Sequence, residues 1–414
     1  MRIAIVGAGV AGLVCARLLH ARHDVRVFEA AERVGGHACT ERVRMAGREV
    51  YVDTGFVVYN ERTYPLFTRL LAELGVASQA TEMSFSVSCA RTGLEYSGGS
   101  LGGLLADPAN LLRPRFLGMV RDVLRFYREG AELAERTDTK TTLGEWLDGR
   151  GYGDAFVERH LLPMGAAIWS ADPGCIRDFP AAAFARFFAN HGLLALRNRP
   201  EWRVVSGGSA RYVERLIAPF RARIHAGEAV REARRDEAGV ELAFASGARA
   251  RFDQVIFATH ADQALACLPE ATRAERALLG AARFTPNDAV LHTDASFLPR
   301  RRRAHASWNF ALAREPRAAA TVTYDMTRLQ RLDTPTPLLV TLNPERSIDS
   351  ARVLRRFRVH HPVYDRAALE AQAPLREISG ADRIWFCGAW RGWGFHEDGV
   401  RSAHDTAGAL LRRA

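Results

Sequence analysis

The first residues able to do chemistry are three closely spaced glycines, Gly7, Gly9 and Gly12, and an acid, Glu29. In a strand-to-helix turn these glycines permit the tight turn, the approach of a pyrophosphate to the backbone, and close helix–strand packing. The N–H groups that begin the helix attract phosphate, and a carboxylate 17 residues after the last glycine can accept the hydroxyls of a ribose. The pattern predicts a dinucleotide site without distinguishing NAD from FAD.

These residues need a strand, a helix and a second strand to bring them together. Residues 2–6 are apolar and largely branched, which predicts a buried parallel strand. An alanine- and leucine-rich helix is expected through His20, and residues 25–28 predict the second strand. Glu29 then lies at the same sheet edge as the glycine turn.

Three later segments return toward this edge. Gly35 and Gly36 form a second glycine turn just before His37. Residues 252–260 predict a middle buried strand that ends in small residues, and residues 383–388 predict a last strand that ends on glycine. We therefore expect the N-terminal, middle and C-terminal parts of the chain to share one cofactor.

With these motifs the sequence resembles the flavoprotein superfamily of amine oxidases, protoporphyrinogen oxidases and carotenoid desaturases. The resemblance implies an α/β fold and FAD as the cofactor. It implies a discontinuous Rossmann-like FAD-binding domain over 1–75, 200–280 and 380–414, with a mixed-sheet and helical substrate domain over 76–199 and 281–379.

The same resemblance implies which residues contact the cofactor, and Val230 is expected to contact the adenine through its backbone. The residues assigned to FAD are Gly7, Gly9, Ala11, Gly12, Glu29, Ala30, Arg33, Gly35, Gly36, His37, Thr54, Gly55, Val230, Gly388, Glu397, Asp398, Gly399 and Val400. His37 is a departure, because relatives usually carry arginine there. This difference is expected to change the charge beside the pyrophosphate or the flavin.

A narrower resemblance covers most of the chain. Segments 53–60, 187–194, 205–209, 307–309 and 394–399 are similar to a bacterial subgroup of amine-oxidase-like proteins. That subgroup is commonly encoded beside methyltransferases of the cyclopropane-fatty-acid-synthase type. The resemblance implies an enzyme that modifies membrane fatty acyl chains, with a lipid methyltransferase as a possible partner.

Flavin oxidation needs a substrate C–H bond held about 3–3.5 Å from the ring in a site without water. Trp308, Tyr324 and His396 are the candidate catalytic residues. A histidine near neutral pKa can act as acid or base, although structural histidines and ordinary aromatic packing are equally compatible with these residues. Further candidates for the flavin-facing wall are Trp390, Trp393 and Phe395, and a second candidate acid or base is His191.

The lysine content bears on the reaction. The sequence has one lysine, Lys140, in the polar stretch 137–142. Many amine oxidases of the superfamily place a lysine near the flavin, and Lys140 is far in sequence from that position. The chain therefore favours C–H oxidation, desaturation or isomerisation of an apolar substrate. The alternatives are oxidation of a small amine and a non-catalytic flavoprotein partner of a lipid methyltransferase.

Composition excludes several other classes. The net charge of +10 comes from 57 basic and 47 acidic residues that are mixed along the chain, so nucleic acid is not an expected partner. The six cysteines are isolated, which predicts no metal site and fits a cytoplasmic protein. No second dinucleotide motif follows a strand, so the substrate itself is expected to reduce the flavin, with oxygen or a quinone as acceptor.

Two basic segments are compatible with contact between this protein and the inner membrane. Residues 116–134 predict an amphipathic helix with Arg121, Arg125 and Arg128 on one face, and residues 300–303 are four arginines. A solvated arginine face is the alternative. The residues expected on the apolar face of the helix are Phe116, Val120, Val123, Leu124 and Tyr127. No apolar run is long enough for a transmembrane helix.

Overall fold

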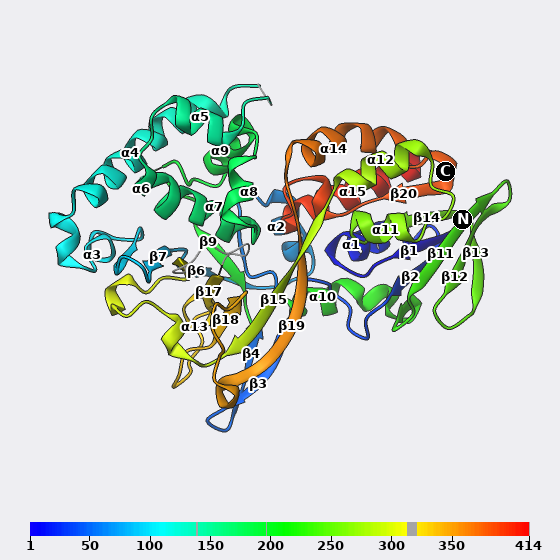
Figure 1. Cartoon of the computed structure of the whole chain (residues 1–414). Coiled ribbons are helices and arrows are strands. Elements are labelled where there is room, and N and C mark those ends of the chain that lie inside the picture. The colour runs from blue at the N-terminus through cyan, green and yellow to red at the C-terminus, as the bar shows by residue number, and fades with distance from the viewer. Residues whose placement is uncertain (138–139, 196, 313–320, 414) are drawn as a thin grey trace.

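A computed structural model describes residues 1–137, 140–195, 197–312 and 321–413 (Figure 1). The chain forms two lobes, and both termini lie in the lobe on the right of Figure 1. That lobe contains a five-stranded parallel sheet. Its strand order is β10 (Ile224–Ala226), β2 (Asp24–Glu29), β1 (Arg2–Val6), β14 (Gln254–Phe257) and β20 (Ile384–Phe386).

Helices cover this sheet and fix the glycine turns at its edge. Helix α1 (Val10–Leu19) follows β1 directly and packs against the last helix, α15 (His396–Arg413). Apolar residues of β1, α1 and α15 form one continuous core with Ile3, Leu13 and Val400 fully buried. The remaining helices of this lobe are α2 (Pro65–Glu73), α10 (Ala210–Ile217), α11 (Ala261–Ala266), α12 (Arg273–Ala281) and α14 (Arg366–Ile378).

The predicted strand over 252–260 is divided in the structure. Strand β13 (Arg249–Phe252) closes an antiparallel sheet with β11 (Val230–Asp236) and β12 (Gly239–Phe244), and β14 begins two residues later. The change of sheet occurs at Asp253, whose carboxylate accepts the N–H of Arg2 at 2.7 Å. The sequence pattern shows apolar residues on both sides of this point, so it does not reveal the change.

The second lobe combines a seven-stranded mixed sheet with a helical layer. The sheet order is β19 (Val353–Pro362), β15 (Phe284–His292), β18 (Leu339–Leu342), β17 (Thr321–Asp325), β16 (Trp308–Leu312), β7 (Phe85–Cys89) and β8 (Leu94–Ser97). The long antiparallel pair β15 and β19 extends toward the other lobe (Figure 1). Smaller sheets pair β3 (Thr40–Met45) with β4 (Arg48–Asp53), and β9 (Trp202–Val205) with β5 (Val58–Asn60) and β6 (Ser78–Thr81).

The helical layer packs aromatic side chains against the strands. Phe126, Phe156, Phe184 and Phe188 are fully buried there. Its main elements are α3 (Leu101–Leu104), the 3-10 helix Pro108–Leu112, α4 (Pro114–Ala134), α5 (Leu143–Gly149), α7 (Leu162–Trp169), α8 (Pro173–Arg177) and α9 (Ala181–Asn190).

The predicted helix over 116–134 is present as α4, but its apolar face differs from the expected one. Leu124 is exposed, whereas Phe126 is buried against Trp146 and Phe188. The helix contacts α9 along one side only, and no element of the described chain covers Leu124. Among the described residues, no helix is both long and apolar enough to cross a membrane.

Candidate functional site

The two glycine turns lie against each other at the carboxyl edge of the parallel sheet. Gly35 donates its N–H to the carbonyl of Ala8 at 2.8 Å, and Gly9 and Gly35 form an isolated parallel bridge. Gly36 has a φ of +57°, and a Cβ there would lie 3.0 Å from the Cα of Gly9. A side chain at Gly36 would therefore push the two turns apart.

Glu29 lies at the end of β2 beside the first turn. Its Oε2 accepts the N–H of Ala8 at 2.8 Å and its Oε1 accepts the N–H of Ala31 at 3.0 Å. These bonds fix the carboxylate at the sheet edge and leave lone pairs for ribose hydroxyls. The helix N-terminus, the glycine turns and this acid together fit a dinucleotide.

A cavity of about 1440 Å³ extends from these turns into the second lobe. Pockets for a single small ligand measure roughly 300–1,000 Å³, so this cavity has room for a dinucleotide and a substrate. Twelve of the residues assigned to FAD line it: Gly7, Gly9, Ala11, Glu29, Ala30, Arg33, Gly36, His37, Thr54, Gly55, Val230 and Gly388.

The other six assigned residues lie behind this lining. A Cβ on Gly12 would collide with the carbonyl of Gly7, so Gly12 allows the helix and the strand to pack closely. Gly35 donates to the carbonyl of Ala8 and so holds the two glycine turns together. Glu397 accepts the N–H groups of Leu66 and Phe67 at 3.0–3.2 Å and so caps α2. The remaining three are at the start of the last helix. Gly399 and Val400 are buried there, and the half-buried Asp398 accepts the N–H groups of Trp393 and Phe395 at 3.0 Å.

Arg33 lines the cavity, but its guanidinium is bonded to the glycine turn itself. It donates to the carbonyls of Gly36 at 3.0 Å and Ala38 at 3.2 Å. Arg33 therefore stabilises the turn, and positive charge for a pyrophosphate has to come from other residues as well.

Four histidines line the cavity next to this turn: His37, His260, His360 and His361. The ring centroid of His37 lies 5.7 Å from that of His361 and 6.4 Å from that of His260. Desolvation, together with repulsion among the rings, lowers the pKa of His260 to about 4 and that of His361 to about 3. The accessible surface of His37 faces the cavity, and enclosure by the cavity walls lowers its pKa too.

The protonation of His361 is fixed by its neighbours. Asn287 uses its Oδ1 to accept from Asn343 Nδ2 at 2.7 Å, which leaves its Nδ2 to face Nδ1 of His361 at 3.1 Å. Because an amide nitrogen only donates, Nδ1 of His361 accepts, and the neutral ring carries its proton on Nε2. Asn287 and His361 lie on the paired strands β15 and β19.

His396 is held inside the protein rather than free in the cavity. Its Nε2 lies 2.9 Å from the hydroxyl of Tyr212, and its ring stacks on Phe56 with a centroid distance of 3.5 Å. Burial lowers the pKa of His396 well below its ordinary value, so the ring is neutral. Its Nε2 therefore accepts a hydrogen bond from the Tyr212 hydroxyl. His396 still forms part of the cavity wall.

Trp308 and Tyr324 face each other across β16 and β17 and both line the cavity. Their rings meet edge to face, with centroids 5.1 Å apart. The Trp308 Nε1–H is buried without a hydrogen-bond partner in the described chain, and burial raises the pKa of Tyr324 to about 12. The pair thus presents aromatic surface to the cavity, and neither side chain is charged at neutral pH.

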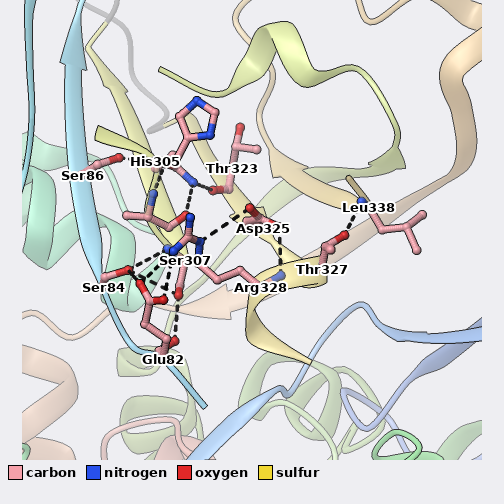
Figure 2. A network of polar contacts seen from close by, with 12 residues as sticks. Glu82, Ser84, Ser86, His305, Ser307, Thr323, Asp325, Thr327, Arg328 and Leu338 are labelled. Carbon is pink, nitrogen blue, oxygen red and sulfur yellow. Dashed lines mark hydrogen bonds and ion pairs between the residues drawn. The ribbon is translucent and has the colours of Figure 1, made fainter. Parts of the chain in front are cut away.

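A polar network holds these strands in register (Figure 2). Ser84 Oγ accepts the N–H of Ser307 at 3.0 Å and donates to Glu82 at 2.7 Å. Arg328 donates to the same Glu82 carboxylate at 2.9 Å, and its backbone N–H binds Asp325 at 3.1 Å. The network connects the segment before β7 with the ends of β16 and β17, and so fixes the positions of Trp308 and Tyr324.

The end of the cavity in the second lobe has apolar walls. They include Met164 and Ile168 of α7, Phe85 of β7 and Phe187 of α9. Two histidines lie there, and desolvation lowers the pKa of His160 and of His191 to about 4. The charged residues of the lining include Arg199 and, on β19, Arg355, Arg356 and Arg358.

The other sequence candidates have varied positions. Trp390 and Phe395 line the cavity, whereas Trp393 packs behind it against Tyr364 and Phe187. Lys140 is exposed in the short segment before α5. It is not part of the cavity lining.

The sequence profile of the flavin containing amine oxidoreductases matches residues 10–411. This chain belongs to that family. It is an FAD-dependent oxidoreductase, and the predicted family, cofactor and fold class are confirmed. The bound flavin supplies the hydride chemistry, and the residues above supply orientation, charge and exclusion of water.

Two comparisons add detail. The chain is 30% identical over 249 residues to AofH of Mycobacterium tuberculosis, which is named as a flavin-containing monoamine oxidase. That alignment covers 58% of this chain and 53% of AofH, so the chain spans about half the length of the curated relatives it matches.

Solved structures share the fold at low identity. A putrescine oxidase bound to putrescine gives a TM-score of 0.72 at 17% identity, with 100% of both chains covered. Cyclohexylamine oxidase from Brevibacterium oxydans gives 0.70 at 16% over 100% of this chain and 99% of that chain. A CLA-producing fatty acid isomerase from P. acnes gives 0.67 at 15% over 99% and 98%.

Sequence reasoning did not identify several residues of the cavity wall. His260 and His361 join His37 only through the fold, and Met164 and Ile168 are part of an apolar helix that the sequence does not distinguish from core. The contacts assigned to individual residues with FAD stay predictions.

Proposed function

We propose that this FAD-dependent oxidoreductase acts on an apolar substrate, a fatty acyl chain of membrane lipid, by C–H oxidation, desaturation or isomerisation. The observation that carries the proposal is the lining of the cavity in the second lobe. Its walls are apolar and aromatic side chains of α7, α9 and β7, and its histidines are neutral at pH 7. Such walls bind hydrocarbon through burial of apolar surface.

An ammonium substrate fits this end less well. Burying a cation requires a counter-charge, and the acids of the cavity lining, Glu29, Glu41 and Asp53, lie on β2, β3 and β4 rather than on the apolar walls of α7, α9 and β7. Arg199 also lines the cavity, and its guanidinium attracts a carboxylate or phosphate. Lys140 lies outside the cavity, so the reaction has to proceed without a lysine near the flavin.

The chain's own residues give this substrate a defined position. Trp308 contributes aromatic surface to the cavity wall, against which an acyl chain can pack. Tyr324 and Phe395 narrow the cavity beside it. These side chains would orient a C–H bond toward the flavin and exclude water.

Oxidation of a small amine is the second candidate. The similarity to AofH favours it, because that relative is named as a monoamine oxidase. The two candidates differ in the charge of the substrate, so one assay separates them.

The test is anaerobic reduction of the bound flavin, followed by its absorbance. The panel contains free fatty acids, phospholipid vesicles with saturated, unsaturated or cyclopropane acyl chains, and primary amines. We expect bleaching, or a changed acyl product by mass spectrometry, with the lipids alone. Bleaching by amines alone contradicts the proposal. Rapid reduction of the flavin by NADPH alone contradicts the expectation that the substrate itself reduces the flavin.

The same comparison in cells, with and without the protein, addresses the third alternative. A changed acyl species supports catalysis on lipid. An unchanged lipid profile, with a methyltransferase complex that persists in a Gly36→Ala variant, favours a non-catalytic partner.

A further inference from the structure

Five exposed leucines gather at one end of the helical layer. They belong to α3, the 3-10 helix Pro108–Leu112 and α4, at the left edge of Figure 1. Leu101 is 80% exposed and Leu112 is 86% exposed, far more than a leucine at the margin of a core. We call this set the leucine patch: Leu101, Leu111, Leu112, Leu117 and Leu124. Several strongly exposed leucines on neighbouring elements are typical of an interaction site.

The charge around the leucine patch is positive. Arg115, Arg121 and Arg128 are exposed on the same segment. The two acids between residues 98 and 128, Asp107 and Asp122, are both buried and both bonded within the protein. Asp107 and Asp122 pair with Arg113 and Arg121, but five arginines against two acids leave residues 98–128 with a net positive charge.

A second basic segment is fixed beside the first. Glu95 accepts the N–H groups of Arg300 and Arg301 at 2.9 and 3.0 Å. The Arg301 guanidinium also bridges to Asp107 at 3.2 Å, just before the 3-10 helix that carries Leu112. Arg302 and Arg303 directly follow Arg301 along the chain, and both side chains are exposed. The arginine loop is thus attached to the segment that presents the leucines.

We propose that the leucine patch, with its surrounding arginines, docks this chain on the surface of an anionic lipid bilayer. Leucine side chains that insert at the headgroup boundary gain hydrophobic free energy, and arginines at the same level attract anionic lipid. A protein partner with an acidic rim, or a second copy of this chain, is the competing occupant. The copy is disfavoured by charge, because two equally basic patches repel each other.

The cavity reaches the docking segment. Gly98 and Gly99, just before α3, and Tyr127 of α4 belong to its lining. If the proposed function holds, this is the route by which an acyl chain passes from the bilayer toward the flavin. Docking itself does not depend on that substrate, so the two proposals can fail separately.

The test is co-sedimentation of the holoenzyme with vesicles of phosphatidylcholine, with and without about one-third phosphatidylglycerol. We expect binding to the anionic vesicles, weakened as salt rises from about 0.05 to 0.5 M. The double variant Leu101→Ser/Leu112→Ser should bind at least about tenfold more weakly. Arg302→Gln/Arg303→Gln should weaken binding only to anionic vesicles.

Tyr51→Ser is the matched control, because Tyr51 is an exposed apolar side chain, at 42%, on β4 in a different part of the fold. Flavin absorbance and melting temperature verify that each variant is folded. As a second reporter, Leu112→Trp keeps the patch apolar and should give a blue-shifted fluorescence on binding. Equal binding by wild type and the leucine double variant overturns the proposal, as does no binding at low salt. Leucine-dependent dimers in ultracentrifugation without lipid also overturn it, in favour of an interface between copies.

Discussion

The Tyr212 hydroxyl donates to Nε2 of His396 across 2.9 Å, inside a wall where the His396 ring also stacks on Phe56. The histidine proposed as a catalytic acid or base is therefore already engaged, neutral and enclosed. Its nitrogen becomes available to a substrate only if Tyr212 moves away.

Removal of this hydroxyl should destabilise the protein. In Tyr212→Phe the buried Nε2 of His396 loses its donor, so the free energy of unfolding should fall by about 1–3 kcal/mol. Urea unfolding measures it, with Tyr51→Phe as an exposed control. If His396 only positions other groups, the activity of Tyr212→Phe should depend on pH in the same way as the activity of the wild type. A new titration near pH 6.5 would show that His396 itself exchanges protons during turnover.

Gly36→Ala should weaken FAD binding. A Cβ at Gly36 would lie 3.0 Å from the Cα of Gly9, so the two glycine turns must separate. We expect the Kd for FAD to rise about tenfold or more. Gly47→Ala has the same left-handed strain, with φ of +78°, in the β3–β4 hairpin, where nothing lies within 4 Å of the Cβ. Equal losses in the two variants would mean that strain alone, and not the cradle, causes the effect.

FAD affinity should depend on pH through the histidines that line the cavity. Without the cofactor, the pKa of His260 is lowered to about 4 and that of His361 to about 3, and His37 and His360 face them. A bound pyrophosphate raises these values, so the complex holds more protons than the free protein. Affinity then falls as pH rises from about 4 through the raised pKa, by up to about tenfold per pH unit for one proton.

Calorimetric titration with FAD in two buffers of different ionisation enthalpy counts this proton directly. His37→Gln should reduce the proton uptake, and His404→Gln, at an exposed position of α15, should not. Arg33 and His396 are the other charged or titratable groups that act on His37. A Kd that stays constant from about pH 5.5 to about pH 8 would show that the rings bind as neutral donors.

His160 should make the protein sensitive to acid. Desolvation lowers the pKa of His160 in the folded protein to about 4 from an ordinary value of 6.5. Between these two pH values the unfolded chain therefore binds more protons than the folded protein. The contribution of His160 is present above pH 6.5 and is lost as pH falls toward 4, by up to about 3 kcal/mol. Two carboxyls with pKa raised to about 6, Asp53 and Asp398, oppose this trend. The difference between wild type and His160→Gln, measured by urea unfolding at pH 7 and about 4.5, isolates the histidine.

A carboxylate placed in the apolar end of the cavity should change the substrate preference. In Ile168→Asp we expect loss of turnover on acyl substrates by at least about 100-fold, since a buried charge repels hydrocarbon. Flavin content should stay the same, because Ile168 lies on α7, away from the glycine turns. Ile168→Val is the control for packing. Unchanged acyl turnover in Ile168→Asp would place the substrate elsewhere.

The sequence predicted the cofactor motifs because their chemistry is local. Gly7, Gly9 and Glu29 are close together along the chain. A Cβ on Gly7 would lie 2.8 Å from the carbonyl oxygen of Ala258, whereas the space beside Gly9 is open for a ligand. Glu397 was assigned to the cofactor by resemblance, but it caps α2, and that contact joins residues 331 positions apart. No local pattern reveals such a contact.

The histidines and Leu124 illustrate the same limit. His260 follows β14 and His361 ends β19, so their meeting depends on how two different sheets are oriented. Leu124 has helical spacing that fits a core, and only the absence of a covering element in the described chain leaves it exposed. Periodicity indicates which face of a helix is apolar, not whether anything packs on it.

The strand order of the parallel sheet has a consequence for biosynthesis. Strand β1 is the first to leave the ribosome, but its neighbour β14 begins at residue 254 and β20 at residue 384. At roughly 5–20 residues per second, β14 waits roughly 6–25 s for β20 after its own synthesis. During that time the edge of the sheet is unpaired, and Gly388 and the start of α15 are missing from the cofactor site. A nascent chain therefore needs protection of this edge until its last residues are made, and FAD can stabilise only a finished chain.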